Sequence, residues 1–263
     1  MVGELTNGER QPEFCTQHGF AYRCEWGIEG LEALAAGSAV VIIVDVLRFT
    51  TAVTCALESG ARVLPYRWND AEAIDYAAAR QAVLAGRREL GEPSLSPTDL
   101  LTIAAGTRLV LPSPNGSAIA VRARELGVAH VLAGCLRNAS AAALTARQLA
   151  DGGAISIIAA GERRGSADGP LRPAIEDQLG AGAILAALDP SAAMSAPRCS
   201  PEAAGARAAF VAARPLLFDT LAASASGREL IARGWDDDVA TSAALDVTNV
   251  VGILHGHEFQ QTP

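Results

Sequence analysis

The sequence contains no lysine, because all 21 of its Lys and Arg residues are arginine. Without lysine a chain cannot form the Schiff base of pyridoxal-phosphate enzymes, and it cannot place a P-loop lysine on a nucleotide phosphate. Haloacid-dehalogenase-type phosphatases pair an aspartate nucleophile with a lysine and open with D-x-D, whereas the apolar run ending at Asp45 continues with Val46 and Leu47. These three classes of mechanism are therefore excluded.

Cysteine is scarce, and long apolar runs are missing. The five cysteines are odd in number and none are spaced as C-x-x-C, so the sequence predicts neither a disulfide framework nor a zinc ribbon. No run approaches the roughly 18 apolar residues of a membrane span, and residues 1–20 lack the apolar core of a signal peptide. We expect a cytoplasmic protein with no membrane partner.

Positive charge is also in deficit, with a formal net charge of −8 and a pI near 5.0. This balance argues against nucleic acid or an anionic membrane as a partner, because both need a basic surface. A small anionic ligand would have to be held by local arginines or backbone amides. With 263 residues and 50% hydrophobic content, the chain can form a single α/β domain over 1–263, with a possible mobile connection at 189–205.

Short apolar runs suited to buried strands alternate with alanine-rich helical stretches. Continuous apolar strands between helices indicate a sheet covered on both faces. We therefore predict a three-layer α/β/α fold with a mostly parallel or mixed sheet. The predicted strands are 39–45, 61–66, 107–112, 129–134, 154–161 and 249–254.

Polar residues follow four of these strands. Because ligands bind at the carboxyl ends of parallel strands, we expect these residues to converge on one site. The four segments are Asp45–Thr51, Ser113–Ser117, Gly134–Asn138 and Gly161–Arg164.

A carboxylate at the end of a buried strand is costly unless it is paired, hydrogen-bonded or metal-bound. For Asp45 the candidate partners are Arg48 and Mg²⁺. The alternative is that Asp45 is a helix N-cap with Arg48 as its local ion pair, and that Thr50 and Thr51 are ordinary helix residues.

Three further segments have both a functional and a structural interpretation. The turn Asn115-Gly116-Ser117 can bind a phosphate oxygen at a helix start, or it can be a plain turn. Glu176 and Asp177 can be metal ligands or acid/base groups, or can simply complement a helix dipole. Arg163 and Arg164 can bind an anion or be solvated, and the acidic run 235–239 can be a helix cap or a hard-cation site.

Five motifs occur in an order that resembles the 2-phosphosulfolactate phosphatase family, a group of Mg²⁺-dependent hydrolases associated with coenzyme M biosynthesis. The resemblance covers residues 39 to 188, with weaker similarity at 234–238 and 247–253. The motifs are Asp45-Val-Leu-Arg48-Phe-Thr-Thr51, Ala56-Leu57-Glu-Ser-Gly60-Ala61, Pro114-Asn115-Gly116-Ser117, Asn138-Ala139-Ser140-Ala141, and Ile175-Glu176-Asp177 with Ala181-Gly182.

The resemblance implies a phosphatase acting on a small anionic phosphate monoester. Mg²⁺ would be held by Asp45 and by Glu176 or Asp177, and a spare carboxylate would be nucleophile or base. The phosphate would be bound by Arg48 and the turn at 115–117. The remaining substrate-binding positions implied are Thr50, Thr51, Arg137, Asn138, Arg163 and Arg164, with the three arginines holding a sulfonate and a carboxylate.

The chain departs from the family pattern at Phe49, at Ser113-Pro114, at Ser117 and across 85–100. We expect the segment 85–100 to shape the substrate pocket. A relative acting on another small phosphate monoester therefore remains an alternative, as does a non-catalytic anion-binding module. A Rossmann-type oxidoreductase is a more distant one.

Overall fold

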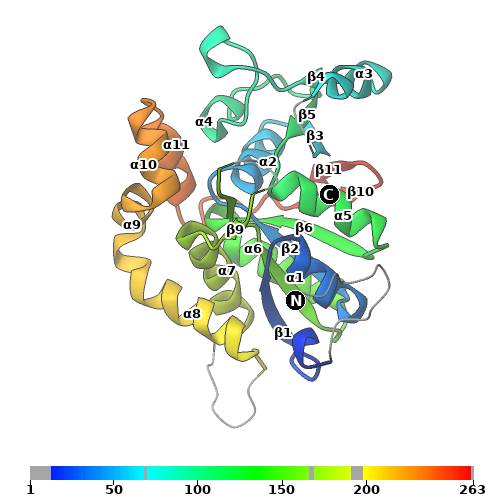
Figure 1. Cartoon of the computed structure of the whole chain (residues 1–263), viewed down its shortest axis with the longest axis vertical. Helices are drawn as coiled ribbons and strands as arrows, with labels where there is room; N and C mark the ends of the chain where they lie inside the picture. The colour runs from blue at the N-terminus through cyan, green and yellow to red at the C-terminus, as the bar shows by residue number, and fades with distance from the viewer. Residues whose placement is uncertain (1–12, 68–69, 166–168, 191–197, 262–263) are drawn as a thin grey trace, which may run out of the picture.

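The computed structural model of the protein describes residues 13–67, 70–165, 169–190 and 198–261. Its main feature is a nine-stranded mixed sheet in the order β1-β7-β2-β6-β10-β11-β3-β5-β4 (Figure 1). The strands are β1 (Tyr22–Trp26), β2 (Val40–Val44), β3 (Arg62–Tyr66), β4 (Val83–Leu84), β5 (Arg108–Pro112), β6 (His130–Gly134), β7 (Ile155–Ala159), β10 (Gly252–His255) and β11 (Glu258–Gln261). A separate two-stranded ribbon joins β8 (Glu162–Arg163) to β9 (Leu171–Arg172).

All six strands predicted from apolar runs are present, and the predicted mixed sheet is confirmed. The strands that the sequence did not reveal have weak apolar patterns. β1 carries Arg23 and Glu25, β4 has only two residues, and β11 reads Glu-Phe-Gln-Gln. Their place in the sheet is decided by pairing with neighbouring strands, which a local pattern does not encode.

The antiparallel hairpin β10–β11 lies between two parallel blocks, β1-β7-β2-β6 and β3-β5-β4. Because three successive pairings across the hairpin are antiparallel, the second block runs opposite to the first. Sheets twist by about 20–25° per strand, so the five steps from β2 to β5 add roughly 100–125°. This twist accounts for the loop after β5 reaching the end of β2, where the Gly116 amide lies 3.0 Å from Asp45 Oδ2.

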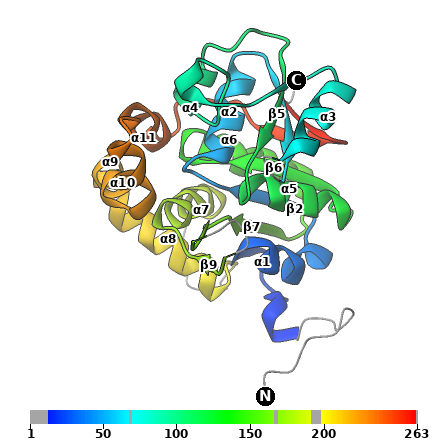
Figure 2. The ribbon, with the colours of Figure 1, turned by 45° about the horizontal axis from the view of Figure 1, so that its top comes forward.

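The helices cover both faces of the sheet, which confirms the three-layer arrangement (Figures 1 and 2). Side chains of β2 alternate between the two faces: Val40, Ile42 and Val44 pack with residues of α6 and α7, whereas Val41 and Ile43 pack with α1, α2 and α5. Burial on both faces explains why this strand is apolar without interruption. The helices are α1 (Gly27–Leu34), α2 (Phe49–Glu58), α3 (Ala71–Ala79), α4 (Pro97–Leu100), α5 (Gly116–Glu125), α6 (Ala139–Ala150), α7 (Ile175–Leu188), α8 (Pro201–Ala213), α9 (Leu217–Ala223), α10 (Ala225–Ala232) and α11 (Asp236–Ala243).

Helices α8 to α11 form an arc along one side of the molecule, from the lower edge of Figure 1 up to α4. Two of them start at serine caps, since Ser200 and Ser224 accept the amides of Ala203 and Gly227. Of the connection predicted at 189–205, residues 191–197 lie outside the described part of the chain, and 201–205 form the start of α8.

Among the described residues, no single helix has the length and apolar character needed to cross a membrane. The segments Pro201–Ala223 and Ala225–Ala232 have this length and apolar character only when they are taken together, and the chain bends by 53° between them.

Candidate functional site

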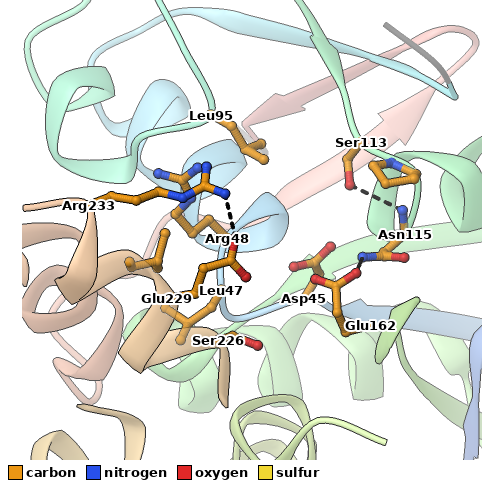
Figure 3. A pocket seen from close by; sticks show the side chains of 12 residues that line it. Asp45, Leu47, Arg48, Leu95, Ser113, Asn115, Glu162, Ser226, Glu229 and Arg233 are labelled. Atoms are coloured by element: carbon orange, nitrogen blue, oxygen red, sulfur yellow. Dashed lines mark hydrogen bonds and ion pairs between the residues drawn. The ribbon is translucent and has the colours of Figure 1, made fainter. Parts of the chain in front are cut away.

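A cleft of about 150 Å³ opens where the loops after β2 and β5 meet β8 and α10 (Figure 3). Figure 3 shows two chemically different sides. Asp45, Asn115 and Glu162 lie together on one side, and Arg48, Arg233 and the Glu229 carboxylate that pairs with Arg233 lie on the other. The remaining lining residues are Leu47, Leu95, Ser113, Pro114, Ser226 and Leu230.

Asp45 is buried at the end of β2, with 5% of its surface exposed. Its Oδ1 accepts the Phe49 amide at 3.1 Å and its Oδ2 accepts the Gly116 amide at 3.0 Å. Burial raises the pKa of Asp45 to about 7, and the nearby charges of Glu162 and Glu176 push it in the same direction against the two amide bonds. Asp45 can therefore exchange a proton near neutral pH.

The raised pKa predicts that the metal-free protein loses stability as pH rises. In the folded state Asp45 keeps its proton up to pH 7, whereas an unfolded aspartate loses it near pH 4, so the folded state binds more protons between these values. We expect the free energy of unfolding to fall by about 2 kcal/mol between pH 5.5 and 8. Urea unfolding in EDTA measures this, and a slope equally steep in Asp45→Asn would contradict the assignment.

The turn at 113–117 holds Asp45 in place. The Gly116 amide, predicted to bind phosphate, donates to Asp45, and Ser117 Oγ donates to the Leu111 carbonyl at 2.7 Å from a fully buried position. Asn115 starts α5 and lines the cleft. Of the three turn residues, Asn115 thus has a side chain at the cleft surface.

Gly116→Ala should disturb the site, because the added Cβ would collide with the Phe49 ring and lie 2.7 Å from Asp45 Oδ2. Overpacking of this kind costs about 1–3 kcal/mol, and the shift of Asp45 should lower kcat as well. Thermal unfolding and a phosphatase assay measure the two effects. Gly205→Ala is the matched control, since a Cβ there meets nothing within 4 Å; equal behaviour of the two variants would refute the packing argument.

Asp177 and Glu176 begin α7 and are both buried. Asp177 clamps two loops, accepting the Val46 amide at 2.7 Å and the Gly161 amide at 2.8 Å. Burial raises the pKa of Asp177 well above its usual range, and Asp45 and Glu176 add to the effect. Among the described residues, Glu176 Oε2 is buried and receives no hydrogen bond. Such an oxygen is costly unless a ligand completes it.

Glu162 is a site residue that the sequence analysis did not select. It lies on β8, lines the cleft, and accepts the Asn115 side-chain amide at 2.8 Å and the Arg163 amide at 2.7 Å. The other polar atom of the Asn115 side chain, Oδ1, is buried and receives no hydrogen bond within the described structure. Glu162 follows a predicted strand, and that position was the available signal.

Asp238 is the second residue that the sequence analysis did not select, although the run 235–239 was noted. It is fully buried on α11 and binds Arg48 Nη1 at 2.6 Å and Arg88 Nη1 at 3.2 Å. Ser96 Oγ donates to its other oxygen at 2.6 Å. The partner of Arg48 is therefore Asp238, 190 residues away, and Asp238 sets the position of Arg48 in the cleft.

Thr50 and Thr51 are fully buried on the first turn of α2. Their hydroxyls donate to the carbonyls of Asp45 and Val46 at 2.8 Å each, and Thr50 also accepts the Asp45 amide. The structure thus places both threonines as braces of the loop that carries Asp45.

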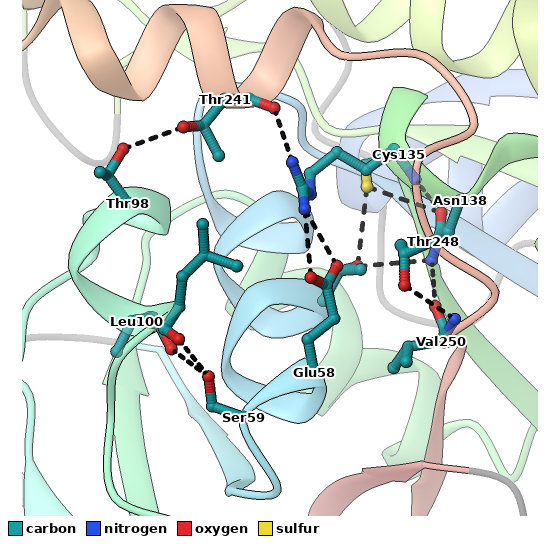
Figure 4. A network of polar contacts seen from close by, with 12 residues as sticks. Glu58, Ser59, Thr98, Leu100, Cys135, Asn138, Thr241, Thr248 and Val250 are labelled. Carbon is teal, nitrogen blue, oxygen red and sulfur yellow. Dashed lines mark hydrogen bonds and ion pairs between the residues drawn. The ribbon is translucent and has the colours of Figure 1, made fainter.

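Arg137 and Asn138 do not line the cleft. Figure 4 shows the polar network that contains Glu58 and Asn138. Arg137 binds Glu58 at 3.1 Å, at the far end of α2 from Arg48, and a helix of ten residues spans about 15 Å. Asn138 is fully buried and donates to Val250 O and Ala133 O. These contacts tie η4 (Leu136–Asn138) to the sheet and to α2.

Arg163 and Arg164 do not line the cleft. Arg163 donates to the Gly169 carbonyl at 3.3 Å and lies 3.8 Å from Glu29, and Arg164 is exposed.

A divalent cation such as Mg²⁺ would fit the carboxylates of Asp45, which lines the cleft, and of Glu176 and Asp177, which do not line it. In the described residues no three acidic, His or Cys side chains are grouped closely enough to hold a metal by themselves. Mg²⁺, however, is usually bound through one or two carboxylates and retains several waters or substrate oxygens. A divalent cation would give the unpartnered Glu176 Oε2 a ligand. It would also reduce the mutual repulsion of Asp45, Asp177 and Glu176.

Comparison with known proteins assigns a family to this arrangement. The family model described as 2-phosphosulpholactate phosphatase matches residues 29–257. A 2-phosphosulfolactate phosphatase from Methanothermobacter thermautotrophicus is 32% identical over 222 residues, covering 82% of this chain and 87% of the relative. A protein from Thermus thermophilus named probable 2-phosphosulfolactate phosphatase is 30% identical over 229 residues, covering 82% and 88%. These matches confirm the resemblance found in the motifs, and the chain belongs to the 2-phosphosulfolactate phosphatase family of phosphoric monoester hydrolases.

Proposed function

We propose that the protein hydrolyses 2-phosphosulfolactate to sulfolactate and phosphate in a Mg²⁺-dependent reaction. The observation that carries the proposal is the composition of one cleft, in which the buried Asp45 after β2 and the half-buried Glu162 after β7 face an arginine fixed by Asp238. Phosphoryl transfer needs positive charge around the phosphoryl oxygens and a carboxylate or water in line with the ester oxygen.

Asp45 and Glu176 are the residues that we propose as Mg²⁺ ligands, with Glu162 or Asp177 as the next candidates. When bound, the cation would neutralise phosphoryl oxygens and lower the pKa of a bound water. Asp177 already accepts two amides, so its free capacity is smaller than that of Glu176.

Arg48 is the residue that we propose to bind the phosphate. Asp238 and the indole of Trp235, whose ring centroid lies 4.9 Å from the guanidinium carbon, hold Arg48 against the cleft wall. The Asn115 side chain lies across the cleft and can donate to a phosphoryl oxygen if it leaves Glu162. The proton for the leaving alkoxide would come from a carboxyl that does not hold the cation.

A second candidate is hydrolysis of a different small phosphate monoester. The observation that favours it is the position of Leu95, which lines the cleft. Leu95 belongs to the segment 85–100, where the family pattern is weakest. An apolar side chain beside Arg48 restricts the polar groups that a substrate can carry at that point.

By the main proposal the enzyme would act in the cytoplasm in coenzyme M biosynthesis.

The test is phosphate release from 2-phosphosulfolactate and about a dozen other phosphate monoesters, with Mg²⁺ or with EDTA. Turnover that is fastest on 2-phosphosulfolactate and lost in EDTA is the expected result. Turnover confined to another ester would show that the substrate is that ester and not 2-phosphosulfolactate. Turnover undiminished by EDTA would contradict the proposed dependence on Mg²⁺. Release from none of them would reject the activity for this chain.

A further inference from the structure

Arg233 is a cleft residue for which the proposed reaction has no role so far. It follows the last turn of α10 and lines the cleft on the side opposite Asp45 (Figure 3). Its guanidinium carbon lies 5.3 Å from the ring centroid of Trp235, the same indole that Arg48 contacts. One aromatic ring therefore supports two arginines at the cleft wall, and this arrangement limits the orientations of both guanidinium groups.

The ion pairs of the two arginines differ in strength. Arg48 is bound to the fully buried Asp238. Arg233 is bound to Glu229 at 2.6 Å, one helical turn earlier, in a pair whose side chains are 55% and 64% exposed. Exposed pairs at this spacing are held weakly, so an anion entering the cleft can displace the Glu229 carboxylate at little cost.

The charge distribution separates the two ends of an anionic substrate. Asp45 and Glu162 repel an anion unless a cation intervenes, so the phosphate is the group that can use their side of the cleft, through Mg²⁺. A second anion on the same small molecule has to lie away from these carboxylates. The side formed by Arg48 and Arg233 is the part of the cleft wall that carries guanidinium groups.

We propose that Arg233, supported by Trp235, forms a second anion subsite that binds a sulfonate or carboxylate of the substrate at a distance from the phosphate. The inference rests on the proposed function for its substrate. It assigns to Arg233 the role that the sequence had assigned to Arg137, Arg163 and Arg164, which do not line the cleft. A planar guanidinium suits three-oxygen and two-oxygen anions because it can donate two parallel hydrogen bonds.

The test compares Arg233→Gln with Arg228→Gln, whose arginine is exposed on the same helix and does not line the cleft. The substrates are 2-phosphosulfolactate, 2-phospholactate without the sulfonate, and 2-phosphooxyethanesulfonate without the carboxylate. We expect Arg233→Gln to lower kcat/KM on 2-phosphosulfolactate by about tenfold to hundredfold, mainly through KM. The loss should be at least tenfold smaller on whichever analogue lacks the group bound by Arg233, which identifies that group. Arg233→Lys should fall between wild type and Arg233→Gln.

Equal losses on all three substrates would mean that Arg233 binds the phosphate, and no loss would mean that it binds nothing; either result overturns the subsite. Binding of sulfolactate, which keeps both anions and lacks the phosphate, gives a readout independent of turnover. Calorimetry should show a Kd about tenfold higher for Arg233→Gln than for wild type and Arg228→Gln. Wild type that hydrolyses nothing while this difference persists would reject the proposed reaction and retain the subsite. Identical Kd values would reject the subsite alone.

Discussion

Asp45→Asn is expected to lower kcat/KM for the substrate by at least about 10³-fold. Asp45 follows β2 and lines the acidic side of the cleft, and its carboxylate accepts the amides of Phe49 and Gly116. An asparagine carries no negative charge, and it is a poor Mg²⁺ ligand. Loss of a preorganised charged group in a buried site costs two to three orders of magnitude by itself, and loss of a metal ligand adds to that.

The same variant needs a structural control, because an asparagine amide would face one of the two backbone amides that now donate to the carboxylate. We expect a stability loss of about 1–3 kcal/mol, small enough to leave the protein folded. Thermal unfolding and a Mg²⁺ titration by calorimetry separate the effects. Asp75→Asn, on the exposed face of α3, should match wild type in both assays. Asp45→Asn with activity within tenfold of wild type would exclude Asp45 as a catalytic group.

Asp238→Ala is expected to have the largest effect on stability, about 3–5 kcal/mol. The substitution leaves Arg48 without its carboxylate and leaves Arg88 with Asp99 alone, and removing one partner of a buried pair leaves the other charge uncompensated. It also removes the acceptor of Ser96 Oγ, which links the segment before α4 to α11. Activity should fall as well, because Arg48 loses the contact that positions it.

The neighbouring Asp237→Ala is the matched control. Asp237 lies on the same first turn of α11 but is exposed, so its loss should cost less than about 1 kcal/mol through the helix dipole alone. Urea unfolding measures both variants, and kcat and KM should be determined well below the midpoint of Asp238→Ala. A cost below 1 kcal/mol for Asp238→Ala would show that the network does not depend on this carboxylate.

Much of the site could be derived from the sequence because its residues follow strands. Asp45 and Glu176 came from local patterns: a carboxylate closing an apolar strand, and a pair of acids opening an apolar helix. Glu162 also follows a strand, but the sequence analysis selected the neighbouring Arg163 instead. In the structure Glu162 lines the cleft, whereas Arg163 contacts Gly169 and Glu29.

By itself the sequence determined the layers of the fold, the predicted strands, the absence of lysine chemistry and the strand ends that carry acids, since all of these are encoded within a few neighbouring residues. The tertiary structure decided which side chains share the cleft. Asp238 meets Arg48 across 190 residues, and Arg233 reaches the cleft from an outer helix that no strand-end rule selects. The physical reason is that an arginine can be recognised in a sequence, but the carboxylate that fixes it or the water that solvates it is set by packing between distant elements.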